Sequence, residues 1–199
     1  MKRILLLSLL FVTLLVPALP LAAEGAGGLL FQVVKPAWNP AFLGGETMPY
    51  DLEFMGGYGY GVTEEGMVIG GFGMGFFDTN LVSYDYDRLN PHLAGGVGGV
   101  ILGSRVIGTR SAHLDLDCRL GLGGVGSWGG TAGARGYAIC YAEPYAELGL
   151  GLTPWMHLSA TLGYTVMGNL IPGRFFSDLF DHSPTLGFTL SFGDFRRSW

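Results

Sequence analysis

The sequence is poor in charged residues, and above all in lysine. Only 14% of its 199 residues are charged, and Lys2 and Lys35 are its only lysines. With so few cations and a formal net charge of −5, the chain has no basic patch that could neutralise a phosphate backbone. We therefore expect no nucleic-acid partner.

Long apolar runs are also scarce, and the clearest one stands at the N-terminus. Lys2-Arg3 precede an apolar run from Ile4 to Val16, and small residues follow at 22 and 23. This run is shorter than the ~20 residues that a membrane-spanning helix needs, so we interpret residues 1–23 as a secretory signal peptide. Its removal takes the formal charge from −5 to −7 and leaves residues 24–199 as one domain. No later run is long enough for a spanning helix, so a mature chain that enters a membrane must do so as strands.

Helical periodicity is lacking as well. Apolar residues instead recur at every second position, which is the period of a β-strand. The clearest case is 156–166, where Met, Leu, Ala, Leu, Tyr and Val alternate with His, Ser, Thr, Gly and Thr, and the ranges 113–122 and 186–193 repeat the pattern. Glycine is abundant at 35 residues, yet 49% of the chain is hydrophobic, which argues against disorder.

This alternation predicts eight strands in the mature chain. Their ranges are 28–35, 50–62, 66–77, 91–103, 112–126, 136–152, 155–167 and 184–194. Short connections at 63–65, 104–111 and 153–154 alternate with longer ones at 36–49, 78–90, 127–135 and 168–183. Barrels with short periplasmic turns and long outer loops show this alternation, with both chain ends on the periplasmic side. The predicted fold class is therefore all-β, a single antiparallel up-and-down β-barrel of about eight strands.

The composition of the strand faces favours a membrane-type barrel. A soluble barrel needs a well-charged outer face, whereas the second face here is mostly glycine, serine and threonine. We therefore predict that the apolar faces point outward to lipid and that the small or polar faces line the lumen, including the glycines of 57–61 and 71–75. Aromatic residues near predicted strand ends fit headgroup depth: Tyr50, Phe76, Phe77, Trp128, Trp155 and Tyr164. A soluble periplasmic β-barrel or sandwich is the alternative.

A family resemblance rests on the C-terminal half of the chain. Glu143-Pro-Tyr-Ala-Glu-Leu-Gly-Leu-Gly-Leu-Thr-Pro-Trp155 runs through a tight turn into Leu158-Ser-Ala-Thr-Leu-Gly-Tyr164, and Leu186–Phe192 forms a closing strand. In this pattern the chain resembles the small eight-stranded outer-membrane barrels, the class of the OmpA transmembrane domain, OmpX and OmpW. The resemblance implies an outer-membrane protein surrounded by lipids. Members usually finish on the aromatic residue of the last strand, whereas this chain continues past Phe195 with Arg196-Arg-Ser-Trp199.

Charged residues gather on the polar faces of two neighbouring predicted strands. One face carries His113, Asp115, Asp117 and Arg119, and the next carries Tyr141, Glu143, Tyr145 and Glu147. Buried carboxylates have to be paired, so Arg119 should engage one or more of Asp117, Glu143 and Glu147. We interpret Asp115, Asp117, Arg119, Glu143 and Glu147 as a barrel-interior polar cluster that plugs the lumen. A gated pore or a ligand site built from the same groups is the alternative.

Cysteine is nearly absent, since Cys118 and Cys140 are the only two. Two cysteines in an exported protein suggest a disulfide. Both lie at equal distance from Gly129, so a symmetric hairpin would place them opposite each other and within bridging range. A shift of two residues in the loop would separate them and leave two small apolar side chains against lipid. The sequence leaves both arrangements open.

Catalytic and metal-binding patterns are lacking. Ser111 with His113 and Asp115, and His157 with Ser159, are the candidates for a hydrolase site, but no nucleophile motif accompanies them. The four histidines show no metal spacing. We therefore predict a non-enzymatic barrel without metal or cofactor and with a structural or surface-interaction role, in which the long loops would contact any protein partner. A small pore or carrier for small or apolar solutes is the alternative, and a lipid-modifying enzyme comes third.

Overall fold

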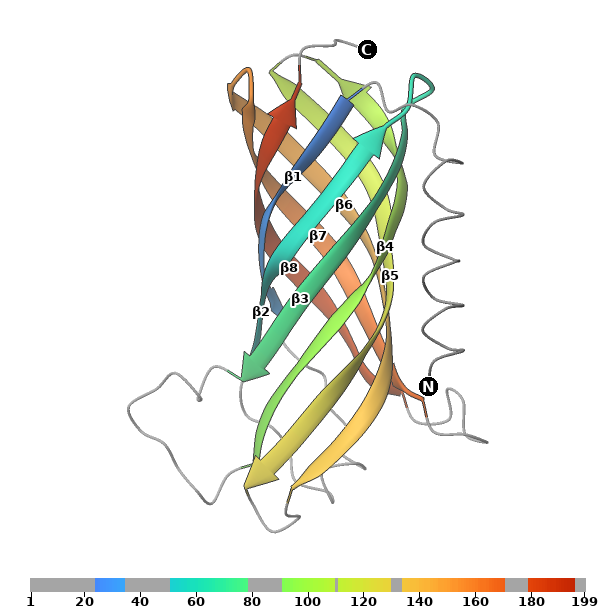
Figure 1. The fold of residues 1–199 in the computed structure, drawn as a ribbon, viewed down its shortest axis with the longest axis vertical. Coiled ribbons are helices and arrows are strands. Elements are labelled where there is room, and N and C mark those ends of the chain that lie inside the picture. The colour runs from blue at the N-terminus through green and yellow to red at the C-terminus, as the bar shows by residue number, and fades with distance from the viewer. Residues whose placement is uncertain are drawn as a thin grey trace, which may run out of the picture.

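The computed structural model describes residues 24–34, 51–78, 91–109, 111–129, 134–170 and 179–195. Eight antiparallel strands form a closed barrel in which each strand pairs with the next and β1 pairs with β8 (Figure 1). The strands are β1 (Glu24–Val34), β2 (Leu52–Val62), β3 (Met67–Asp78), β4 (Pro91–Gly108), β5 (Ala112–Gly129), β6 (Arg135–Thr153), β7 (Met156–Asn169) and β8 (Leu179–Asp194). The predicted fold class is confirmed. Within these ranges no helix is long and apolar enough to cross a bilayer.

Three strands differ most from their predicted limits. β1 begins at Glu24 instead of 28, β4 continues to Gly108 instead of 103, and β8 begins at Leu179 instead of 184. Beyond its predicted end β4 still pairs with β5, through Arg105 opposite Asp115. Alternating apolar residues mark a strand in the sequence, and a charged pair of this kind does not belong to that pattern. Within the predicted loop 168–183, residues 168–169 and 179–183 are strand, whereas 171–178, like 36–49 and 79–90, lie outside the described residues.

Three short turns lie at one end of the barrel. The first reverses the chain between β2 and β3, where Gly66 N donates to Thr63 O at 3.0 Å and Gly66 adopts a φ of 81° that favours glycine. The others join β4 to β5 around Thr109 and β6 to β7 at 154–155. The start of β1 and the end of β8 lie at this same end, at the top of Figure 1. We call it the turn end, and the opposite end the loop end.

The outer wall of the barrel is apolar. Because side chains alternate along each strand, one set faces the lumen and the other faces outward. The outward set includes large exposed hydrophobic residues on every strand, with only one each on β2 and β3: Leu29, Phe31, Val33, Met55, Met67, Val100, Leu102, Val106, Ile107, Leu116, Leu120, Leu122, Leu148, Leu150, Leu152, Leu158, Leu162, Tyr164, Leu186, Phe188 and Phe192. Trp155 is exposed in the turn between β6 and β7.

The faces of β2 and β3 are reversed relative to the prediction. Their large residues, including Phe54, Tyr58, Phe72 and Phe76, are buried in the lumen, and the alternating glycines at 57–61 and 71–75 lie on the outer wall. The physical reason is volume, since an eight-stranded barrel has to fill its interior with side chains. Phe54 and Phe76 stack there with ring centroids 4.9 Å apart. Phe76 therefore lies inside the barrel, and its predicted place at headgroup depth is wrong.

Candidate functional site

The lumen is divided into an apolar half and a polar half. β1 to β4 supply most of the apolar side chains: Leu30, Val34, Leu52, Phe54, Tyr58, Val62, Val68, Phe72, Met74, Phe76, Leu93, Val97 and Ile101. β5 to β8 supply most of the polar ones: His113, Asp115, Asp117, Arg119, Ser127, Glu143, Glu147, His157, Ser159, Thr161, Thr165, Ser183, Thr185, Thr189 and Ser191. Both sets are buried, so the described side chains fill the barrel.

Arg119 is the centre of the polar half. Its Nη1 donates to Glu143 Oε2 at 2.7 Å and to Gln32 Oε1 at 3.2 Å. Its guanidinium also lies over the Tyr145 ring, 3.9 Å from the ring centroid, in a cation–π contact. Arg119 and Glu143 are each only 1% exposed, so their charges depend on each other rather than on water.

Glu143 is satisfied on both of its oxygens. Tyr141 donates its hydroxyl to Oε2 at 2.7 Å, and Thr185 donates to Oε1 at 2.9 Å. Gln32 Nε2 in turn donates to the Tyr141 hydroxyl at 3.3 Å. The network therefore joins β1, β5, β6 and β8 across the lumen. A buried ion pair is tolerated when its hydrogen-bonding atoms are satisfied, a condition that Glu143 meets, whereas Arg119 Nε has no hydrogen-bond partner among the described residues.

A second polar group lies at the turn end. Arg105 contacts Asp115 through two hydrogen bonds, Nε to Oδ1 at 2.9 Å and Nη2 to Oδ2 at 3.1 Å. His113 Nε2 lies 3.6 Å from Glu147 Oε1, and His113 Nδ1 lies 3.3 Å from His157 Nδ1. The His157 ring stacks on Phe195 at a centroid distance of 3.7 Å. We call His113, His157 and Phe195 the turn-end stack.

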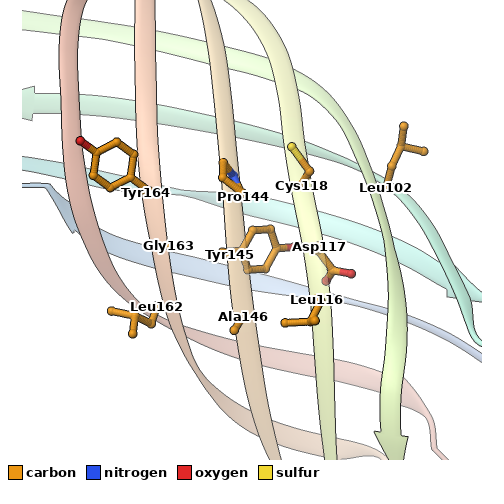
Figure 2. Close-up of a pocket in the computed structure, with 10 residues that line it drawn as sticks. All are labelled: Leu102, Leu116, Asp117, Cys118, Pro144, Tyr145, Ala146, Leu162, Gly163 and Tyr164. Carbon is orange, nitrogen blue, oxygen red and sulfur yellow. The ribbon is translucent and has the colours of Figure 1, made fainter.

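The five residues predicted as an interior cluster all face the lumen and are buried, but they divide between these two groups. Arg119 pairs with Glu143 at mid-lumen, whereas Asp115 and Glu147 belong to the turn end. Asp117 lies between them with the Tyr145 hydroxyl directed at its carboxylate (Figure 2). Arg105 was not predicted to face the lumen, because residues 104–111 were expected to form a turn. Gln32 was not predicted either, since nothing in its own strand distinguishes it.

Inward-facing glycines provide the room for these large polar side chains. A Cβ at Gly149 would collide with the His113 ring, and one at Gly103 would collide with the Asp117 carboxylate. The interior of a small barrel is close-packed, so each long side chain needs a missing one opposite it. Other inward-facing glycines make the same room for aromatic rings, since a Cβ at Gly95 would collide with the Phe76 ring.

On the outer wall, a hollow of about 500 Å³ lies over the β5–β6 pair (Figure 2). Pro144 lies at its centre, and the β6–β7 pairing skips Glu143 and Pro144 because proline has no N–H to donate. The lining residues are Leu102, Leu116, Asp117, Cys118, Pro144, Tyr145, Ala146, Leu162, Gly163 and Tyr164. The side chains that line this hollow are mainly apolar.

Of the two arrangements that the sequence leaves open for Cys118 and Cys140, the structure has the separated one, and both thiols are free. Cys118 lies opposite Pro144, and Cys140 lies opposite Leu122. The β5–β6 hairpin is thus centred on residue 131 rather than 129, which moves the two cysteines apart along the strands. Both are partly exposed and share the outward face with their apolar neighbours.

The candidate hydrolase residues make other contacts. His113 faces Glu147 and His157, and Ser111 is exposed in the turn between β4 and β5, where its carbonyl oxygen accepts from Gly151 N at 2.8 Å. Ser159 is buried two residues from His157 on β7. Among the described side chains, no group of three or more His, Cys, Asp or Glu residues could hold a metal ion.

The barrel is similar to the crystal structure of Ail, the attachment invasion locus protein of Yersinia pestis. The superposition has a TM-score of 0.50 at 11% identity and covers 86% of this chain and 100% of Ail. Ail in complex with the heparin analogue sucrose octasulfate gives a TM-score of 0.47 at 12% identity, over 85% of this chain and 97% of that one. No family model matches the chain, and no curated protein matches its sequence. The resemblance to small eight-stranded outer-membrane barrels is confirmed for the fold.

Proposed function

We propose that this chain is an outer-membrane barrel with a closed lumen, which acts through the loop end on a partner outside the membrane. Residues 1–23 direct export and are then removed, and membrane lipids surround the outer wall. The observation that carries the proposal is the contrast between the two faces of the barrel. Large apolar side chains are exposed all around the outside, while the charged pairs are buried inside. Soluble proteins rarely expose apolar surface on this scale, whereas a lipid-facing barrel requires it.

The filled lumen favours a surface role over a pore. The Tyr141 ring contacts both Phe54 and Phe72, with its centroid 6.3 Å from that of Phe54 and 5.9 Å from that of Phe72. On the other side of Tyr141, the Arg119–Glu143 pair spans the polar half. A solute would have to displace a buried ion pair and an aromatic cluster together. This arrangement supports the interaction role and the absence of catalysis, and it makes the small pore or carrier the second candidate.

Two arginine substitutions test whether the outer wall faces lipid. Leu162, which is 65% exposed, lies in the middle of β7, whereas Leu152 lies near the turn end of β6. Leu162→Arg should cost about 2–4 kcal/mol in vesicle-reconstituted protein, and Leu152→Arg about 0–1 kcal/mol, because the cost depends on depth in the bilayer. The measurement is urea unfolding of both variants in phospholipid vesicles. Equal and small costs, together with a soluble periplasmic fraction, would refute the membrane location.

Conductance and binding measurements distinguish the surface role from the pore. Arg119→Ala should not raise the ionic conductance of a planar bilayer above that seen with the wild-type barrel, because the apolar half still fills the lumen. Cells that display the barrel should bind to some members of an immobilised array of proteins and glycans. They should lose that binding when residues 36–49 and 79–90 are replaced by short turns. Steady channel openings in the Arg119 variant would instead favour the pore, and binding that survives the loop replacement would refute a role for the loops.

A further inference from the structure

We propose that the turn-end stack of His113, His157 and Phe195 is an acid-sensitive latch that keeps the turn end of the barrel closed. This inference goes beyond the proposed surface role, since it concerns the opposite end of the molecule and requires only a folded barrel. Its three members come from β5, from β7 and from the residue that follows β8. The stack therefore joins separate strands at the place where the chain leaves the barrel.

The geometry of His113 and His157 determines which of their ring nitrogens carry protons. The two imidazole rings lie nearly parallel, with centroids 5.3 Å apart and an interplanar angle of 19°, and their Nδ1 atoms are 3.3 Å apart. This contact requires one Nδ1 that carries a proton and one that does not. Both rings are buried, at 2% exposure each, so water does not substitute for the missing acceptor.

The Nδ1–Nδ1 contact between His113 and His157 is compatible with one added proton on the two rings, but not with two. When the pair carries one extra proton, one Nδ1–H still points at the lone pair of the other ring. When both rings are imidazolium, two N–H groups and two positive charges face each other, and neither nitrogen accepts. Because a solvated imidazole ordinarily changes its charge between pH 5 and 8, mildly acidic medium favours the state in which one ring has left the pair and carries its own proton.

Charged groups surround both rings, and Arg105 and Glu147 lie within electrostatic range of His157. The two carboxylates, however, lie beside His113, whose Nε2 is 3.6 Å from Glu147 Oε1 on β6 and 3.8 Å from Asp115 Oδ2 on its own strand. Arg105 from β4 is held by Asp115, and the Tyr60 phenol on β2 lies within electrostatic range of Arg105, Asp115 and Glu147. The second proton thus falls on His157, whose other neighbour is the apolar ring of Phe195.

The second protonation therefore separates His157 from His113. Imidazolium stacks favourably on an aromatic ring, so His157 and Phe195 move together and leave the lumen as a unit. The buried hydroxyl of Ser159, two residues deeper on the same face of β7, then becomes accessible to solvent. Opening is confined to the turn end, because the Arg119–Glu143 network lies further along the barrel and contains no histidine.

A buried thiol at position 159 reports this opening. Ser159→Cys is made in a chain whose native cysteines are replaced (Cys118→Ala and Cys140→Ala), and the full barrel is reconstituted in vesicles. The probe is 4,4′-dithiodipyridine, which still reacts in acid, and each rate is divided by that of the unfolded protein at the same pH. We expect the relative rate to rise as the pH falls through 6, by about tenfold per pH unit for a one-proton equilibrium.

Two further variants test the assignment. His157→Gln cannot take up the second proton, so its relative rate should be constant over the same pH range. The matched control is His182→Gln, which removes an imidazole that is exposed near the loop end and contacts Tyr164; it should keep the full acid response. An acid response that persists in His157→Gln, or is absent from the parent, would overturn the latch.

Nuclear magnetic resonance of the wild-type barrel in micelles provides a second test, which does not depend on whether those variants fold. The Phe195 ring signals should shift together with the second of two histidine protonation steps. Ring signals that stay constant while both histidines titrate would overturn the proposal.

Discussion

Replacement of Arg119 by methionine should destabilise the barrel by about 3–5 kcal/mol, the usual cost of removing one partner from a buried ion pair. In the wild-type barrel, Glu143 accepts hydrogen bonds from Arg119 at 2.7 Å, from Tyr141 at 2.7 Å and from Thr185 at 2.9 Å. Without Arg119, the two hydroxyl groups remain, but no cation balances a carboxylate that is 1% exposed. Methionine fills much of the vacated volume, so the loss is mainly electrostatic.

The double variant Arg119→Met/Glu143→Gln identifies the origin of that cost. The amide oxygen of the glutamine still accepts from Tyr141 and Thr185, and no buried charge is left. Its free energy of unfolding should lie within about 1.5 kcal/mol of the wild-type value, since a neutral replacement of both partners avoids the unpaired charge. Glu143→Gln alone should be less stable than the double variant, because it leaves the guanidinium without an anion.

The assay is urea unfolding in phospholipid vesicles, followed by the mobility difference between folded and unfolded barrel on an unheated gel. All four proteins are measured at one pH and one lipid composition, so that differences report the interior of the barrel. A cost below about 1 kcal/mol for Arg119→Met would refute the unpaired-charge argument. The same conclusion follows if the double variant is as unstable as the two single costs added together.

Two other predictions concern packing and the cysteines. A Cβ at Gly99 would collide with the Leu120 carbonyl oxygen, whereas a Cβ at Gly73 on the neighbouring strand meets nothing within 4 Å. Gly99→Ala should therefore cost about 1–3 kcal/mol or prevent folding, and Gly73→Ala should fold like the wild type in the same gel assay; equal behaviour would contradict the packing. Cys118 and Cys140 should both react with a lipid-soluble maleimide in the folded barrel without prior reduction, and resistance relieved only by a reductant would reveal a bridge.

Much of the fold could be predicted because alternation is a local property. A strand with apolar residues at every second position shows its period in the sequence, and turn residues mark where it reverses. Eight strands, their order and the three short turns followed from this pattern. The same pattern predicted that the charged residues of β5 and β6 are buried, since they alternate with apolar residues that face the other way: Asp115, Asp117, Arg119, Glu143 and Glu147.

Which face is the inner one is not a local property. In β2 and β3, Tyr58 and Phe72 alternate with glycine, and the sequence pattern does not show which of the two faces lines the lumen. Which face of β2 and β3 lines the lumen depends on the volume that the other strands leave unfilled. The polar side chains of β5 to β8 occupy only the polar half of the lumen. The aromatic residues fill the other half, and the outer wall of these strands is left with glycine.

The sequence by itself determined the strand period, the closed up-and-down topology and the need to pair the charges inside. Only the tertiary structure decided the partners. The β5–β6 register is set by the few residues between the two strands, and its hairpin centre at residue 131 separates the two cysteines, whose thiols are free. Arg105 met Asp115 because β4 continues past its predicted end, and His113 met His157 because β5 and β7 direct both rings into the same end of the lumen. Period is encoded residue by residue, whereas register and the filling of the lumen depend on all eight strands together.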